Sequence, residues 1–176
     1  MPHVTPLPGE AAPPLSFDRM GEDPFDLADT PIDQFLILLF YRGQHCPICR
    51  EMLEELNGKI GEFRYAGMEV VPTSMDTRER AEKQVAEWDI GNLSIGYGMS
   101  EAEARAFGLF ITERWRDHEP PRYSEPGLIV LRPDRTIFAM FLQSVPFTRP
   151  SFDGLLKGLT FVRDKGYPTR GSVPSA

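Results

Sequence analysis

The chain of 176 residues contains only two cysteines, and it lacks both a long apolar run and an excess of positive charge. Two cysteines cannot build a framework of structural disulfides. We therefore expect a reducing, cytoplasmic environment, in which a close cysteine pair is more often catalytic or metal-binding than structural. Both cysteines lie in one short stretch, at positions 46 and 49, and this stretch carries most of the functional information.

The charge balance and the hydropathy pattern argue against two classes of partner. There are 26 acidic residues against 19 basic ones, a net charge of −7, which disfavours a nucleic-acid backbone or an anionic membrane. The longest apolar run, "FLILLFY", is far shorter than the roughly 20 residues that span a bilayer. The first 15 residues have neither a basic start nor an apolar core, so we expect no secretory signal.

The length and the apolar fraction of 41% predict one globular domain over residues 1–176. Seven of the 17 prolines fall within the first 31 residues. This enrichment predicts an irregular, proline-rich N-terminal arm over residues 1–14, with a short edge strand near residues 15–17. A disordered tail over residues 1–8 is the alternative.

The apolar pattern predicts an α/β fold with a central mixed sheet flanked by helices. A helix follows the first buried strand and carries apolar residues from Cys49 to Phe63 at helical spacing. A second helix starts at Asp76 or Thr77, with Val85 on its inner face, and the last one starts near Ser151. Strands are expected at 35–41, 68–74, 128–131 and 136–142, a further capped helix at 100–108 and an irregular loop at 111–123. This order of elements is that of the thioredoxin fold.

The motif Cys46-Pro47-Ile48-Cys49 lies at the predicted elbow between the first buried strand and its helix. A helix N-terminus offers free N–H groups and the positive end of the helix dipole, which favour a thiolate. Cysteines in such positions have pKa values of roughly 3.5–7.5. Pro47 suits the first helical turn, where its missing N–H is not needed. We expect Cys46 to be an exposed nucleophile and Cys49 to resolve its mixed disulfide.

Charged neighbours are expected to reinforce this reactivity. Arg42, Arg50 and His45 place up to three cationic groups around Cys46. His45 is interpreted either as an acid or base for thiol exchange or as a cation that favours the thiolate. Arg42 is interpreted as a flanking charge in preference to a catalyst.

The cysteines have two alternative roles, as metal ligands or as inert buried residues. A zinc site needs four ligands, and the motif supplies two; only His3, His45 and His118 are available to complete it. Two inert buried cysteines are the second alternative. We expect no metal and no cofactor beyond the cysteine pair itself.

The segment "FYRGQHCPICREMLEEL" resembles the active-site region of peroxiredoxin-like proteins of the alkyl hydroperoxide reductase/thiol-specific antioxidant family, in the thioredoxin-like superfamily. The segments "LPGEAAPPLSF", "GMEVVPTSMDT", "EARAFGLF" and "EPGLIVLRPDRTIFAMF" extend this resemblance over most of the chain. The resemblance implies a thioredoxin-like fold, an antioxidant role, and a cis-proline opposite the cysteines, at Pro126.

The chain departs from the motif that this family uses to bind peroxide. The family carries P-x-x-x-T-x-x-C before its peroxidatic cysteine, whereas Leu39 and Gly43 stand at the proline and threonine positions here. The family's arginine before the late strand is replaced by Ser124 and Glu125, with Arg122 as the nearest substitute.

The sequence thus predicts a thiol-disulfide oxidoreductase in which Cys46 attacks, Cys49 resolves and Pro126 shapes the groove. A disulfide or hydroperoxide substrate and a thiol reductant are the implied partners, and a homodimer is compatible with such folds. The alternatives are a thiol peroxidase acting through Cys46, and a non-catalytic binding module. Trp115, His118 and Tyr123 are interpreted as an ordinary insertion in preference to an active-site cover.

Overall fold

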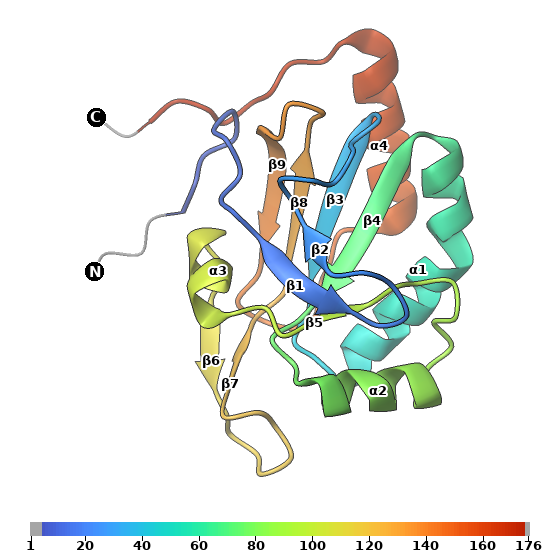
Figure 1. Ribbon diagram of the computed structural model, residues 1–176. Helices are drawn as coiled ribbons and strands as arrows, with labels where there is room; N and C mark the ends of the chain where they lie inside the picture. The colour runs from blue at the N-terminus through green and yellow to red at the C-terminus, as the bar shows by residue number, and fades with distance from the viewer. Residues whose placement is uncertain (1–4, 175–176) are drawn as a thin grey trace.

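The computed structural model describes residues 5–174 (Figure 1). Seven strands form one mixed sheet in the order β2-β1-β5-β4-β3-β8-β9, and β6 and β7 form a separate two-stranded hairpin. The strands are β1 Ser16–Arg19, β2 Phe25–Asp26, β3 Phe35–Phe40, β4 Met68–Thr73, β5 Gly96–Tyr97, β6 Ile111–Glu113, β7 Arg122–Ser124, β8 Gly127–Leu131 and β9 Ile137–Leu142. The helices are α1 Pro47–Tyr65, α2 Arg78–Glu87, α3 Glu101–Ala106 and α4 Phe152–Lys165.

Strand β3 is the centre of the sheet and is buried along its whole length. It pairs in parallel with β4 and antiparallel with β8, so both of its backbone edges are satisfied. Alternate side chains enter different clusters: Ile37 and Leu39 face one side, Leu36 and Leu38 the other. A continuous apolar run is therefore what this position requires.

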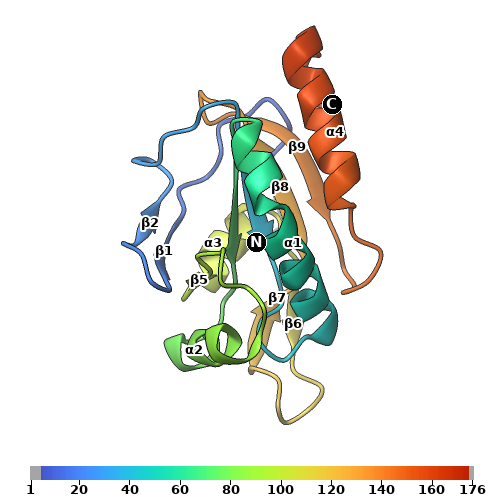
Figure 2. The same ribbon diagram turned by 90° about the vertical axis from the view of Figure 1, so that its right-hand side faces the viewer.

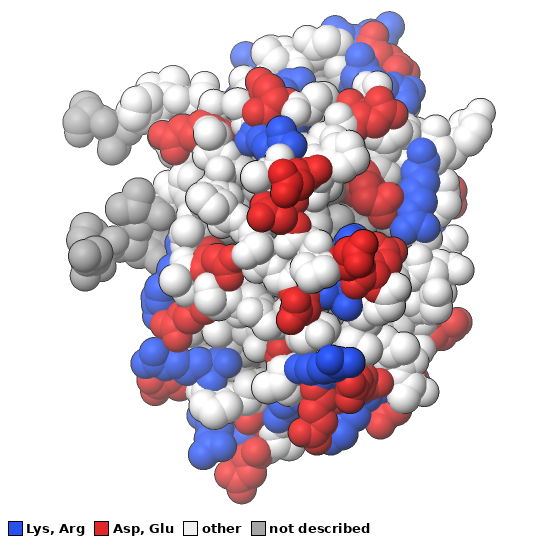
Figure 3. Space-filling view, in the orientation of Figure 1, with Lys and Arg blue, Asp and Glu red and all other residues white. Residues whose placement is uncertain are grey.

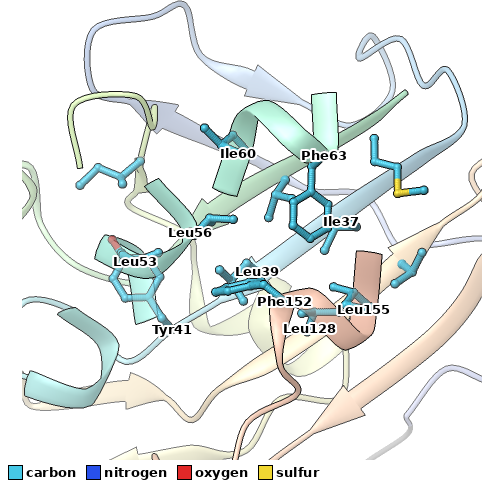
Figure 4. Close-up of a cluster of buried hydrophobic side chains, with 14 of the residues drawn as sticks. Ile37, Leu39, Tyr41, Leu53, Leu56, Ile60, Phe63, Leu128, Phe152 and Leu155 are labelled. Carbon is cyan, nitrogen blue, oxygen red and sulfur yellow. The ribbon is translucent and has the colours of Figure 1, made fainter. Parts of the chain in front are cut away.

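Two layers cover the sheet (Figure 2). Helices α1 and α4 lie on one face, where Leu53, Leu56 and Phe63 from α1 meet Phe152 and Leu155 from α4 (Figure 4). On the other face, α3 and apolar side chains of the N-terminal segment, among them Leu15 and Phe25, pack against Leu36 and Leu38 of β3. The predicted central mixed sheet flanked by helices is confirmed.

Of the two predicted starts of α2, Thr77 is the cap: its side chain accepts a hydrogen bond from the Arg80 N–H, while Asp76 is buried. Two other local predictions were wrong. Val85 is exposed, because Gln84 takes the inward position on this helix. The segment 111–123 is not an irregular loop, because β6 and β7 pair antiparallel and project beyond the sheet (Figure 1).

The expected cis-proline is also corrected. No cis peptide bond occurs among the residues 5–174 that the structure describes, so the Glu125–Pro126 bond is trans. Pro126 immediately precedes β8, whose Gly127 pairs with Phe40 at the end of β3. The proline therefore lies near the cysteine elbow, as the sequence predicted, but in the ordinary isomer.

The N-terminal arm runs along the turn between β8 and β9 and the first residue of β9. Gly9 donates its N–H to the Ile137 carbonyl at 2.7 Å, and Ala11 forms an isolated bridge with Thr136. The guanidinium of Arg135 donates to the carbonyls of three residues just after β2: Leu27, Ala28 and Thr30. A disordered tail over residues 1–8 was the alternative prediction, and residues 1–4 of that segment lie outside the described residues.

The surface carries acidic and basic side chains in alternation over the face shown in Figure 3. Many of them pair along the helices, such as Arg78 with Glu82 and Arg105 with Glu101. In the part of the chain that is described, no helix combines the length and the apolar character that crossing a membrane demands.

Candidate active site

Cys46 caps the N-terminus of α1. Its backbone is extended (φ −103°, ψ 106°), and its Sγ accepts a hydrogen bond from the Cys49 N–H at 3.2 Å. Pro47 occupies the first helical turn, as predicted. The sulfur therefore takes the place of an N-cap oxygen and lies at the positive end of the helix dipole.

This environment favours the thiolate of Cys46. Hydrogen bonds from the Cys49 side chain and backbone, together with the charges of Arg149 and Arg42, lower the pKa of Cys46 to about 6, against an opposing effect of burial. A thiol with this pKa is largely ionised at neutral pH.

The expectation that Cys46 is exposed was wrong. Its side chain is 1% exposed, because the sulfur turns back over the first helical turn and joins the core cluster beside Tyr41. A substrate must be small or must meet a transiently opened elbow.

Cys49 lies one turn further along α1 and is completely buried. Burial and the neighbouring Cys46 raise the pKa of the Cys49 thiol well above its ordinary value, which keeps it protonated at rest. Arg149 donates a hydrogen bond to its Sγ at 3.1 Å. The two free thiols thus have opposite character: one is acidic, and the other is held in reserve.

Arg42 links the elbow to the β6–β7 hairpin. Its guanidinium donates to the Tyr123 hydroxyl at 2.7 Å and lies 3.3 Å from the Glu125 carboxylate, which is 4% exposed. Glu125 also accepts a hydrogen bond from the Thr112 hydroxyl. Tyr123, interpreted from sequence as part of an ordinary insertion, therefore belongs to the surroundings of the cysteines.

The positive charge expected from His45 is not present at neutral pH. Burial and the nearby Arg42 lower the pKa of His45 to about 4. Its ring packs 4.5 Å from the Tyr123 ring, and both ring nitrogens are buried with no partner within the described chain. Arg50 likewise points its guanidinium at Glu54 and the Glu87 carbonyl. Of the three predicted cations, only Arg42 acts on Cys46.

Asp76 supports the backbone that leads to Cys46. Its carboxylate accepts hydrogen bonds from the Gln44 N–H at 2.7 Å and from the Gln84 amide at 2.8 Å. Gln84 in turn accepts from the Tyr41 hydroxyl at 2.6 Å. Burial raises the pKa of the Asp76 carboxyl to about 6. The network fixes both ends of the elbow, at Tyr41 and at Gln44.

No group of three or more histidine, cysteine, aspartate or glutamate side chains suited to a metal ion is found within residues 5–174. His118 lies at the far end of the hairpin, where its carbonyl accepts from Arg80. Trp115, on the same hairpin, is 82% exposed.

A family model described as AhpC/TSA family matches residues 8–140, well over half of the chain. The chain belongs to the AhpC/TSA family. The predicted resemblance is confirmed, and membership of this family supports a peroxiredoxin-like redox role. No curated protein matches the sequence.

The fold of this AhpC/TSA protein is shared by solved peroxiredoxin structures. A peroxiredoxin-like protein from Aquifex aeolicus is 13% identical, with a TM-score of 0.70 over 86% of this chain and 85% of that one. A peroxiredoxin 6 variant of Arenicola marina is 15% identical, with a TM-score of 0.74 over 90% and 74%. Mycobacterium bovis AhpC is 12% identical, with a TM-score of 0.70 over 99% and 100%. These likenesses confirm the thioredoxin-like fold.

Local packing explains why this AhpC/TSA protein has Gly43 where the family motif has threonine. Gly43 has a φ of +128°, and a Cβ built on it would lie 2.6 Å from both carboxylate oxygens of Asp76. A threonine does not fit in this arrangement. Leu39, at the proline position, is a buried residue of β3.

Arg122 is not the substitute for the missing family arginine. It is exposed and pairs with Glu101 and Glu113, away from the sulfurs. The arginine that does reach the cysteines is Arg149, which sequence reasoning missed because it lies 100 residues further along the chain in a segment without regular structure. Asp76 was missed because its sequence context resembled a helix cap.

Proposed function

We propose that this AhpC/TSA protein is a thiol-disulfide oxidoreductase that uses Cys46 and Cys49 as its redox pair. The observation that carries the proposal is the hydrogen bond from the Cys49 N–H to the Cys46 sulfur, which places the first thiol at a helix N-terminus and the second directly behind it. The cysteine pair itself is the redox group, and no cofactor is needed.

The reaction follows from the different character of the two thiols. The Cys46 thiolate attacks a substrate disulfide, forms a mixed disulfide and releases one substrate thiolate, which takes a proton from solvent. Cys49 then loses its proton to solvent and attacks the Cys46 sulfur, and the second substrate thiolate leaves. The substrate gains two electrons, the Cys46–Cys49 disulfide forms, and an external dithiol restores the pair.

The surroundings of Gly43 favour this function over efficient peroxide reduction. The space of the family's threonine side chain is taken by the Asp76 carboxylate, so no hydroxyl can be placed there to hold a peroxide. Pro126 lines a small cavity together with Met52 and with Arg149, the residue that donates to the Cys49 sulfur. We propose that it shapes the substrate groove.

A thiol peroxidase is the second candidate, and the burial of Cys46 favours it. A hydroperoxide is small enough to reach a thiol that is 1% exposed, whereas a protein disulfide needs the elbow to open. In this reaction the Cys46 thiolate takes one peroxide oxygen, becomes a sulfenic acid and releases water or an alcohol; Cys49 then condenses with it and releases water.

Parallel assays separate the two functions. Reduction of a disulfide and consumption of hydrogen peroxide are measured with a dithiol reductant, for the native protein, Cys46→Ser and Cys49→Ser. We expect disulfide reduction that is lost in Cys46→Ser, and slow peroxide consumption. If Cys46→Ser reduced the disulfide as fast as the native protein, the proposal would fail. Fast peroxide consumption with no disulfide reduction would replace it by the peroxidase.

A further inference from the structure

Arg149 directs its whole guanidinium toward the interior of the site. It lies in the segment between β9 and α4, and its Nε donates to the Pro146 carbonyl at 2.8 Å. Its two terminal nitrogens lie 2.9 Å from the Met52 sulfur and 3.1 Å from the Cys49 sulfur. The first of these contacts anchors the side chain, and the other two aim its charge at sulfur atoms.

This cation has no carboxylate partner among the ion pairs of the described chain. Arg42, by comparison, is paired with Glu125. A partly buried guanidinium without a counter-ion is costly unless an anion faces it for part of the time. The charge of Arg149 acts on the Cys46 thiolate, but its hydrogen bond goes to the Cys49 sulfur, which is neutral at rest and becomes an anion when the thiol ionises.

The two sulfurs differ in how far they depend on Arg149, whose charge acts on Cys46 but whose hydrogen bond goes to Cys49. The Cys46 sulfur receives the N–H of Cys49 and the field of the α1 N-terminus. Cys49 lies inside the first turn of α1 and is fully buried, so its negative charge needs a separate partner. The charged and titratable groups that face it are Cys46, Arg149 and the Tyr41 hydroxyl. Arg149 is the cation of this set.

We propose that Arg149 is a catalytic residue of the resolving step, in which it stabilises the negative charge on the Cys49 sulfur. This inference rests on the proposed function. In the mixed disulfide, the Cys46 sulfur is bonded to the substrate and no longer carries charge. Cys49 gives its proton to solvent, its thiolate is held by the Arg149 guanidinium, and it bonds to the Cys46 sulfur while the substrate thiolate leaves.

A coloured aromatic disulfide, 5,5′-dithiobis(2-nitrobenzoate), reports the two steps separately. Attack by Cys46 releases one equivalent of thionitrobenzoate, and attack by Cys49 releases a second. The rates of both releases are measured after rapid mixing with the reduced full-length protein, from pH 6 to pH 10. Cys49→Ser should release one equivalent only, which assigns the second release to Cys49.

In Arg149→Met we expect the second release to slow by about tenfold to a hundredfold at pH 7, the effect of losing one charge-assisted hydrogen bond. The first release should change less, because the hydrogen bonds from Cys49, the helix N-terminus and Arg42 still favour the Cys46 thiolate when the charge of Arg149 is lost. The deficit should shrink as the pH rises, because Cys49 then ionises without the cation. Arg149→Lys should recover part of the rate.

Arg64→Met is the matched control, because Arg64 pairs with Glu69 at the other end of α1; both of its releases should be native-like. A second release in Arg149→Met that is as fast as in the native protein would overturn the inference. A slowing by the same factor at every pH would also overturn it, because that marks a structural defect. Failure of the native protein to give any Cys46-dependent release would instead remove the proposed function itself.

Discussion

The carboxylate of Asp76 accepts a hydrogen bond from the backbone N–H of Gln44, two residues before Cys46. A buried acid from the end of one strand thus holds the elbow that follows the neighbouring strand. The other carboxylate oxygen of Asp76 is buried without a hydrogen-bond partner in the described structure, which suits an acid that carries a proton at mildly acidic pH. Four predictions follow from this arrangement and from the other contacts of the elbow.

Asp76→Asn should change how stability depends on pH. The pKa of this carboxyl is raised to about 6 in the folded protein from 3.8, so folding favours its protonated form. The native protein should lose stability from this group as the pH rises from about 4 to about 6, by on the order of 2–3 kcal/mol. Urea unfolding of both proteins should show that the stability of the native protein, relative to that of Asp76→Asn, falls by this amount across the range.

The comparison must be made as a difference between the two proteins, because His45 acts in the opposite direction. Its pKa is lowered to about 4, so it contributes stability as the pH rises over the same range. Parallel pH profiles for the native protein and Asp76→Asn would contradict the account of Asp76.

Gly43→Thr should destabilise the protein without producing a peroxidase. The substitution places a Cβ against Asp76 at a backbone φ of +128°, and we expect a cost of about 2–4 kcal/mol. Gly58→Ala is the control, because a Cβ at this helical position meets no atom within 4 Å; it should raise stability by roughly 0.5–1 kcal/mol. Thermal unfolding and peroxide consumption are the measurements. Native stability in Gly43→Thr would refute the predicted clash.

The Cys46 thiolate should titrate with a midpoint near pH 6. The Cys49 side chain is the largest of the groups that lower the pKa of Cys46, so Cys49→Ala should move the midpoint upward. Absorbance of the thiolate at 240 nm gives the titration, and the rate of alkylation by iodoacetamide should follow the same curve. Cys46→Ser should lack the transition. A midpoint near 9 in the native protein would contradict the proposed role of the helix N-terminus.

Arg42→Leu should destabilise the fold by leaving the Glu125 carboxylate buried without its charge partner. We expect the free energy of unfolding to fall by about 3 kcal/mol, the lower end of the range for a broken buried ion pair, because the Arg42 side chain is partly open to solvent. The double variant Arg42→Leu/Glu125→Leu should recover much of this loss, since no unpaired charge remains. Chemical denaturation of the two single variants and the double variant measures the coupling. Strictly additive losses would show that the pair does not interact.

The elements around β3 could be predicted from the sequence because their signals are local. The apolar run of β3, the spacing from Cys49 to Phe63 and the Ser100-x-x-Glu103 capping box each specify structure within a few residues. The elbow that carries the cysteines could be predicted because the apolar strand ends where the helical spacing begins. The predicted roles of Cys46, Cys49 and Pro126 in catalysis stay predictions.

The groups that tune the cysteines could not be predicted, because their positions depend on contacts between distant segments. Arg149 reaches Cys49 across 100 residues, and Asp76 reaches Gln44 across 32. No local pattern marks either contact. The burial of His45 likewise depends on Tyr123, whose hairpin lies far along the chain. A lone histidine beside a cysteine gives no sign of whether it will be neutral or charged.

The contacts of the N-terminal segment have a consequence for the order in which the protein folds. Arg135 donates to carbonyls that precede it by 105 to 108 residues, and Gly9 pairs with Ile137. Contacts of such long sequence separation close late, because the chain entropy of the intervening loop must be lost first. During synthesis, residues 9–30 leave the ribosome well before Arg135 and Ile137 exist. We therefore expect this segment to be made before its partners and to dock among the last.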